Sequence, residues 1–137
     1  MAGRTDSDDC TVQNKRILIV DDNEIVLKIL EDFLSDAYLV DGANNASLAL
    51  KTLASNPPDV ILLDVNMPGT DGLTLLESLR NRGVAVPIFI ITGYDSPGLA
   101  ERAARSGATG YLVKPVDLRR LDRLIASALQ VPPLLTD

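Results

Sequence analysis

Histidine and tryptophan are absent from this sequence, and cysteine occurs once, at Cys10. The lack of histidine excludes histidine-based catalytic triads, histidine metal ligands and a histidine phosphocarrier role. A single cysteine cannot close a disulfide within the chain, which is typical of proteins from a reducing compartment. Without histidine or a second cysteine, the residue types argue against a zinc or copper centre.

Long hydrophobic runs are also missing. No apolar segment is long enough to span a bilayer, and the first residues lack the hydrophobic region of a signal peptide. These absences predict a cytoplasmic protein with no membrane association. The net charge of −6 argues against direct binding to nucleic acid, because an acidic chain is repelled by phosphate backbones.

The composition is that of a packed domain. Hydrophobic residues make up 46% of the 137 residues and charged residues 23%, whereas aromatics are only 4%. The core is therefore expected to consist mainly of Leu, Ile, Val and Ala, and the length fits one domain. We expect a flexible leader over 1–14, the domain over 15–130, and a tail or the start of a linker over 131–137.

Short apolar runs alternate with segments of helical periodicity along the chain. The runs predict strands over 17–20, 38–40, 60–63, 88–91 and 110–113. The periodic segments predict five helices, over 24–35, 45–55, 73–82, 97–106 and 117–130. In the first of these helices the apolar positions are Val26, Ile29, Leu30, Phe33 and Leu34.

The alternation predicts an α/β fold. Strands that are apolar on both faces and separated by helices indicate a parallel sheet covered on both sides. With right-handed crossovers the expected product is a doubly wound, flavodoxin-like sheet of five strands in the order 2-1-3-4-5. Periodicity alone does not determine this order.

Polar side chains follow four of the predicted strands. They are Asp21 and Asp22, Asp64, Thr92, and Lys114. The carboxyl ends of parallel strands share one edge of a doubly wound sheet, so these residues are expected to converge. Three carboxylates at close range repel one another and call for a cation, and Mg²⁺ is the natural candidate for oxygen ligands.

An amine and a hydroxyl at the same edge suit the oxygens of a phosphoryl group. Lys114 and Thr92 supply them, and a metal ion together with an ammonium neutralises the charge of a transferring phosphoryl group. A carboxylate can act as the nucleophile and form an aspartyl-phosphate. Asp64 is the best candidate, because it ends the central strand.

Each residue taken alone has a simpler interpretation. An Asp after a strand often caps the next helix, a Lys before Pro is usually solvated, and a Thr at a strand end often serves a turn. The combination at consecutive strand ends favours the functional interpretation.

Four segments together resemble the receiver domains of bacterial two-component response regulators. They are residues 17–23 (ILIVDDN), 60–72 (VILLDVNMPGTDG), 90–93 (IITG) and 110–115 (GYLVKP). The resemblance extends over about residues 15–130. The order and spacing of the four motifs make it specific, although each alone would be weak.

The resemblance implies roles for individual positions. Asp64 corresponds to the phosphoacceptor, and Asp21 and Asp22 to the acidic pair that binds Mg²⁺, with Asp22 favoured as a direct ligand. Asn66 corresponds to the position whose backbone carbonyl completes the metal shell. Lys114 corresponds to the lysine that pairs with the phosphoryl group.

Further positions are implied to take part in switching or to shape the site. Thr92 corresponds to the hydroxyl that moves toward the phosphoryl group, and Tyr111 to an aromatic that swings inward on activation. An ordinary half-buried strand aromatic is nearly as good an interpretation of Tyr111. Gly93 is expected to keep the site open, and Pro115 to follow a cis peptide bond.

The resemblance also implies partners. A sensor histidine kinase or a histidine phosphotransfer protein would donate the phosphoryl group, and a downstream protein, an output domain or a second copy would respond. Arg102, Arg105, Arg119, Arg120 and Arg123 lie on the last two predicted helices and could meet an acidic partner, although solvated surface charges are the safer interpretation. The sequence leaves open whether the domain acts alone or within a longer protein.

Three other function classes are weaker. A haloacid-dehalogenase-type phosphohydrolase carries a second Asp two residues after its nucleophile, where this sequence has Asn66. A constitutive interaction module would ignore phosphate altogether. A dinucleotide-binding domain would need a G-x-G-x-x-G motif after the first strand, and that motif is absent.

Overall fold

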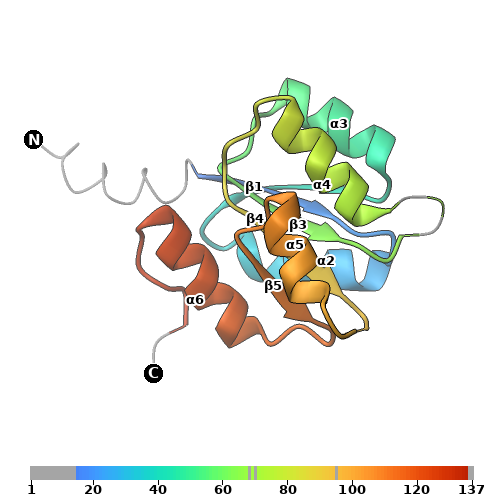
Figure 1. The fold of residues 1–137 in the computed structure, drawn as a ribbon. Helices are drawn as coiled ribbons and strands as arrows, with labels where there is room; N and C mark the ends of the chain where they lie inside the picture. Colours follow the sequence, from blue (N-terminus) through green and yellow to red (C-terminus); the bar gives the residue numbers. More distant parts are fainter. Residues whose placement is uncertain (1–14, 68, 70, 95, 136–137) are drawn as a thin grey trace, which may run out of the picture.

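The computed structural model describes residues 15–67, 69, 71–94 and 96–135 (Figure 1). The leader predicted over 1–14 lies outside these residues. Strands and helices alternate from β1 onward. The strands are β1 (Arg16–Val20), β2 (Leu39–Ala43), β3 (Val60–Asp64), β4 (Ile88–Thr92) and β5 (Gly110–Val113). The helices are α2 (Glu24–Leu34), α3 (Ala46–Ser55), α4 (Gly72–Asn81), α5 (Leu99–Ser106) and α6 (Leu118–Leu129).

The five strands form one parallel sheet in the order β2-β1-β3-β4-β5, which confirms the predicted doubly wound topology. Parallel strands need crossovers, and the helices provide them on both faces of the sheet. Helices α2 and α6 cover one face, and α3, α4 and α5 cover the other, as Figure 1 shows.

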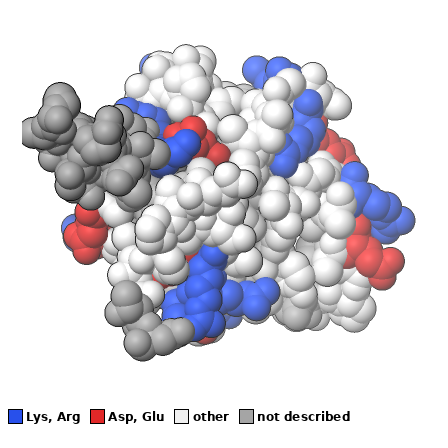
Figure 2. Space-filling model, turned by 90° about the vertical axis from the view of Figure 1, so that its left-hand side faces the viewer, with Lys and Arg blue, Asp and Glu red and all other residues white. Residues whose placement is uncertain are grey.

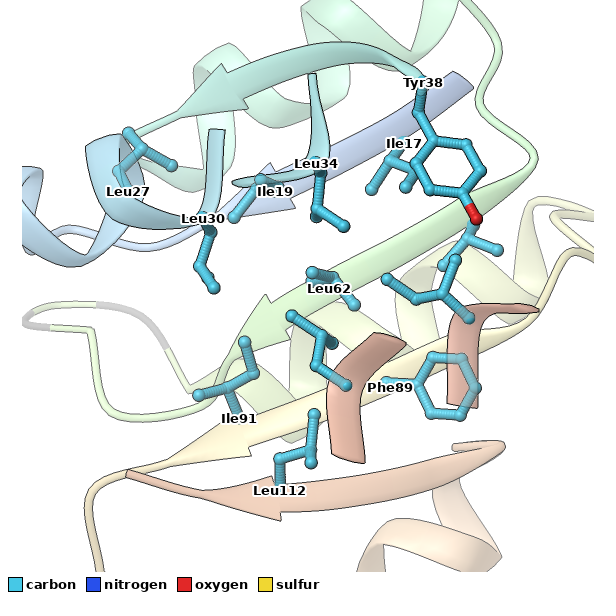
Figure 3. Close-up of a cluster of buried hydrophobic side chains, with 13 residues drawn as sticks. Ile17, Ile19, Leu27, Leu30, Leu34, Tyr38, Leu62, Phe89, Ile91 and Leu112 are labelled. Carbon is cyan, nitrogen blue, oxygen red and sulfur yellow. The ribbon is translucent and has the colours of Figure 1, made fainter. Parts of the chain in front are cut away.

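The core is divided by the sheet into two clusters, because alternate residues of each strand point to opposite faces. On β1, Ile17 and Ile19 face α2 and α6, whereas Leu18 and Val20 face the other three helices. Figure 3 shows the first cluster, in which Leu62, Phe89 and Ile91 continue the layer across the central strands. The buried members of the two clusters are aliphatic apart from Tyr38, Phe89 and Met67, which agrees with the expectation from composition.

The first helix buries a different stripe from the predicted one. Leu27, Leu30 and Leu34 are buried, whereas Ile29 is 50% exposed. Leu27 was not among the predicted apolar positions, and Ile29 was. The difference arises because α2 packs on β1 and β2 with the face that carries Leu27, Leu30 and Leu34. Ile25 and Ile29 are then left on the solvent side.

The second strand begins and ends later than predicted. Tyr38, expected in the strand, precedes it, and the strand continues through Asp41 and Gly42 to Ala43. Tyr38 is buried in the first cluster, and its hydroxyl has no hydrogen-bond partner among the described residues (Figure 3). Burial and the nearby Asp122 carboxylate raise the pKa of this phenol.

The segment after α6 folds back onto the domain. Helix α6 is followed by the cap residue Gln130, which adopts a left-handed conformation, and the chain then returns along the helix. The carboxylate of Asp122, only 2% exposed, accepts hydrogen bonds of 2.7 Å from the backbone N–H groups of Leu134 and Leu135. Leu134 packs against the first core cluster. The sequence analysis did not single out Asp122, and this anchor was not predicted.

Helix α5 is held differently at its two ends. Arg80, on α4, donates hydrogen bonds from Nε and Nη2 to the carbonyl of Gly107 (3.0 and 2.8 Å), the residue that caps the C-terminal end of α5. The same guanidinium donates to the carbonyls of Val84 and Val86. Burial lowers the pKa of Arg80. At the N-terminal end, Gly98 occupies the cap position in a left-handed conformation and supplies no side-chain hydrogen bond.

Candidate phosphoryl-acceptor site

The register of the parallel strands brings the predicted site residues to one edge of the sheet. Val20 of β1 is paired with Leu63 of β3, so that Asp21 and Asp64 follow as neighbours. The ladder extends beyond the strand ends, because the Asp21 N–H donates to the Ala43 carbonyl (3.0 Å). On the other side, the Lys114 N–H donates to the Thr92 carbonyl (2.7 Å). Backbone pairing thus positions the acidic and basic residues of the site.

Three carboxylates meet at this edge. One oxygen from each of Asp21, Asp22 and Asp64 lies within 4.8 Å of the others. Asp21 and Asp64 are almost fully buried, at 0% and 1% exposure, whereas Asp22 is exposed. A buried pair of like charges is costly without a cation, so the cluster is a candidate cation site.

These aspartates are not helix caps. The side chain of Asn23 caps α2, and Asp71 caps α4. Asp21 and Asp64 instead each accept a hydrogen bond of 2.9 Å from the N–H group two residues on, those of Asn23 and Asn66. The capping alternative considered from the sequence is therefore excluded for these residues.

Lys114 provides the positive charge of the site. Its Nζ lies 3.1 Å from Asp21 Oδ2 and 3.4 Å from Asp64 Oδ2. Burial works to lower the pKa of this ammonium, but the hydrogen bonds and charges of the two carboxylates outweigh burial, and the pKa is raised. The solvated-lysine alternative does not hold, because the side chain is only 21% exposed.

Asp64 differs electrostatically from an ordinary aspartate. Burial raises its pKa from 3.8 to about 6, and the neighbouring Asp21 carboxylate adds to the rise. The Asn66 N–H and the Lys114 ammonium oppose it. A buried carboxylate with a raised pKa is typical of a functional site.

The oxygens present fit a hard divalent cation. Asp21 Oδ2 is buried and accepts no hydrogen bond from the part of the chain that the structure describes, although Lys114 Nζ lies nearby. Carboxylate oxygens are the ligands that Mg²⁺ prefers in proteins. Asp21, Asp22 and Asp64 could therefore hold Mg²⁺.

Thr92 lies at the end of β4 with its side chain fully buried. Its hydroxyl lies 2.9 Å from Asn66 Oδ1 and 2.8 Å from the Tyr94 carbonyl, and it accepts a hydrogen bond of 3.1 Å from the Tyr94 N–H. The sequence predicted Thr92 for the site but assigned Asn66 only a backbone role. The contact made by the Asn66 side chain was not predicted, and no sequence signal indicated it.

The remaining predicted positions surround these residues. Tyr111 is half-buried on β5, paired with Ile90. The bond between Lys114 and Pro115 is cis, as expected. A Cβ added at Gly93 would lie 4.0 Å from Lys114 Cδ, an ordinary contact, so the backbone here is open.

The fold places the chain among the doubly wound, flavodoxin-like α/β proteins. The family model described as "Response regulator receiver domain" matches residues 17–126. The chain belongs to this family, the receiver domains of two-component systems, in which phosphorylation and Mg²⁺ binding are typical.

Curated relatives are longer than this chain. The chain is 38% identical over 117 residues to "Regulatory protein AtoC" of Escherichia coli, covering 85% of this chain and 25% of that protein. It is 42% identical over 109 residues to "Response regulator MprA" of Mycobacterium ulcerans, covering 77% of this chain and 46% of the relative. The chain thus spans a quarter to a half of these relatives.

Solved structures agree with the fold. A two-component response regulator from Clostridium difficile superposes with a TM-score of 0.82 at 30% identity, covering 85% of this chain and 97% of that one. A CheY-like receiver domain protein from Methanospirillum hungatei superposes with a TM-score of 0.79 at 31% identity, covering 85% of this chain and 94% of that one. Across the described ranges, no helix combines the length and apolar character needed to cross a membrane.

Proposed function

We propose that this domain is a signalling switch in which Asp64 accepts a phosphoryl group from the phosphohistidine of a sensor kinase or phosphotransfer protein. The observation that carries the proposal is the convergence of three carboxylates within 4.8 Å beside the Lys114 ammonium. This arrangement offers a nucleophile, ligands for a divalent cation and a second positive charge in one place.

The transfer is an in-line displacement at phosphorus. An oxygen of Asp64 forms the new O–P bond while the P–N bond to the donor imidazole breaks, and the imidazole leaves with the bond's electron pair and takes up a proton. Asp21, Asp22, Asp64 and the Asn66 carbonyl are the proposed holders of Mg²⁺, which would neutralise charge on the phosphoryl oxygens. Lys114 would exchange part of its contact with the carboxylates for a phosphoryl oxygen.

The proposed docking surface for the donor lies beside the site on α2. Ile25 and Ile29 are 73% and 50% exposed, and Ile29 lines a largely apolar groove together with Val26, Pro115 and Val116. Exposed apolar side chains rimmed by polar residues are typical of interaction sites. The same groove is lined by Lys114, so a donor seated there would approach the acceptor directly.

The proposed response follows from the Thr92 hydroxyl turning toward the phosphoryl group. Its loop and Tyr111 would move inward, and the surface of α5, β5 and α6 would change for a downstream protein, an output domain or a second copy. Figure 2 shows basic side chains at several places on the face that includes α6. Arg119, Arg120 and Arg123 line one hollow on this helix. An acidic partner fits this part of the surface.

The test is the intact mass of the protein after incubation with acetyl phosphate and Mg²⁺. The wild type and the control Asp36→Asn, which alters an exposed aspartate, should each gain one phosphoryl group, whereas Asp64→Asn should gain none. A gain that persists in Asp64→Asn refutes the acceptor assignment.

No gain in the wild type, under conditions that label another receiver domain, refutes the proposed function. The constitutive interaction module is the outcome in which acetyl phosphate and Mg²⁺ change neither the mass nor the amide chemical shifts. Turnover of an unrelated phosphate ester would instead indicate a phosphohydrolase.

A further inference from the structure

The side chain of Asn66 contacts the switch residue directly. Its Oδ1 accepts hydrogen bonds of 2.9 Å from both the Thr92 hydroxyl and the Gly93 N–H. A backbone N–H can only donate, so the bond from Gly93 fixes which end of the carboxamide faces the β4–α5 loop. Asn66 therefore presents an acceptor, and not a donor, to Thr92.

The hydroxyl of Thr92 has no donor to spare in this arrangement. It carries one proton, and two acceptors lie within reach, Asn66 Oδ1 at 2.9 Å and the Tyr94 carbonyl at 2.8 Å. It also accepts from the Tyr94 N–H. To donate to any new acceptor at Asp64, the hydroxyl must give up these partners.

Asn66 is connected to the acceptor as well as to the switch. Its backbone N–H donates to Asp64 Oδ1 at 2.9 Å, while its side chain holds the β4–α5 loop. Asn66 is exposed and Thr92 is fully buried, so the contact joins a solvent-accessible side chain to a buried one.

We propose that the Asn66 carboxamide is a resting-state latch that competes with the phosphoryl oxygen for the Thr92 hydroxyl. The inference rests on the proposed function, because it assumes that Thr92 turns toward a phosphoryl group on Asp64. The carbonyl assigned to the metal belongs to the backbone, so the latch is a separate role of the same residue.

If the Asn66 carboxamide is a latch, its removal should increase the affinity of the site for a phosphoryl mimic. In Asn66→Ala the backbone carbonyl of residue 66 and the Tyr94 carbonyl remain, but one of the two acceptors that compete for the Thr92 proton is lost, so the form with Thr92 turned toward Asp64 becomes more favourable. One net hydrogen bond is worth about a fivefold change in the equilibrium. If the substitution only disrupted the β4–α5 loop, the affinity for the phosphoryl mimic would fall. The two explanations therefore predict changes in affinity of opposite sign.

The experiment is a titration with beryllofluoride, a mimic of the phosphoryl group, at saturating Mg²⁺. Asn66→Ala should bind it about fivefold more tightly than the wild type, after the Mg²⁺ affinity of each protein has been measured separately. In the Thr92→Val background, which lacks the contested hydroxyl, the same substitution should give no tightening. Unchanged or weaker binding by Asn66→Ala, or equal tightening in both backgrounds, overturns the latch.

A second measurement separates this inference from the proposed function. In the absence of any phosphoryl mimic, the Gly93 amide should exchange with solvent faster in Asn66→Ala than in the wild type. If neither protein binds beryllofluoride, the proposed function fails and the competition fails with it. Fast Gly93 exchange would then still establish the resting contact, and unchanged exchange would overturn that contact too.

Discussion

The Nζ atom of Lys114, at the end of β5, lies 3.1 Å from Oδ2 of Asp21, at the end of β1. The two residues are 93 positions apart, and three strands separate their places in the sequence order of the chain. Lys114 lies slightly farther from Asp64, at 3.4 Å. The lysine therefore serves two buried carboxylates at once, and its charge offsets their repulsion in the protein without metal.

Replacing Lys114 by Gln should destabilise the metal-free protein. The substitution leaves two buried carboxylates side by side without their cation, and the expected loss in the free energy of unfolding is about 1–3 kcal/mol. Urea denaturation at pH 7.5 with a chelator measures it. Lys51→Gln, at an exposed position of α3, is the control and should change little. An equal loss in both variants would contradict the role given to Lys114.

Replacing Asp64 by Asn should have the opposite effect. The folded protein holds the Asp64 carboxyl at a pKa of about 6, above its ordinary 3.8, so the folded state binds this proton more tightly than the unfolded state. Stability from this group is therefore lost as the pH rises from about 4 to about 6. At pH 7.5 without metal, Asp64→Asn should raise the free energy of unfolding by about 1–3 kcal/mol.

The pH profile provides the check on that prediction. The advantage of Asp64→Asn over the wild type should shrink as the pH falls from about 6 to about 4, where both forms lack the charge. Asp36→Asn, at an exposed position, is the control for the substitution itself. A destabilised Asp64→Asn at pH 7.5 would show that burial of the charge is not what raises this pKa.

Replacing Asp122 by Ala should release the segment that follows α6. The carboxylate holds the N–H groups of Leu134 and Leu135, and hydrogen bonds to a charged group are worth about 1.5–3 kcal/mol each. Hydrogen exchange of these two amides should become fast in Asp122→Ala, while the amides of β3 remain protected. Ser127→Ala, at an exposed position of the same helix, is the control. Slow exchange in Asp122→Ala would mean that packing of Leu134 alone holds the segment.

Replacing Arg80 by Lys should destabilise the domain although the charge is kept. An ammonium cannot reproduce the planar fork that reaches the carbonyls of Val84, Val86 and Gly107. We expect a loss of about 2 kcal/mol in the free energy of unfolding, measured by urea denaturation. Arg82→Lys, at an exposed position two residues on, should be neutral.

The sheet and the residues at its edge could be predicted from the sequence for one physical reason. Strands buried on both faces leave an apolar signature, and polar residues that interrupt it must fall at strand ends. Asp21, Asp64 and Lys114 were found in this way, and the parallel register then brings them together. The topology itself needed the additional rule that crossovers are right-handed.

Side-chain contacts between distant loops could not be predicted in the same way. Nothing in the spacing of Asn66 and Thr92 indicates that a carboxamide on one loop accepts from a hydroxyl on another. Asp122 is a similar case, because helical periodicity places an Asp on the surface unless a backbone partner elsewhere makes its burial favourable. The exposure of Ile29 was missed because periodicity gives the apolar stripe but not its orientation on the sheet.

The unequal ends of α5 constrain how this helix can move. Its C-terminal end is fixed by the Arg80 fork on Gly107 and by the contact between Ser106 Oγ and Glu77. Its N-terminal end follows the loop after Thr92, and the cap residue there, Gly98, provides no side-chain hydrogen bond. Because α5 is held at its C-terminal end, a displacement that starts near Thr92 would tilt the helix about that end. The movement would be largest at Leu99 and would decrease toward Ser106.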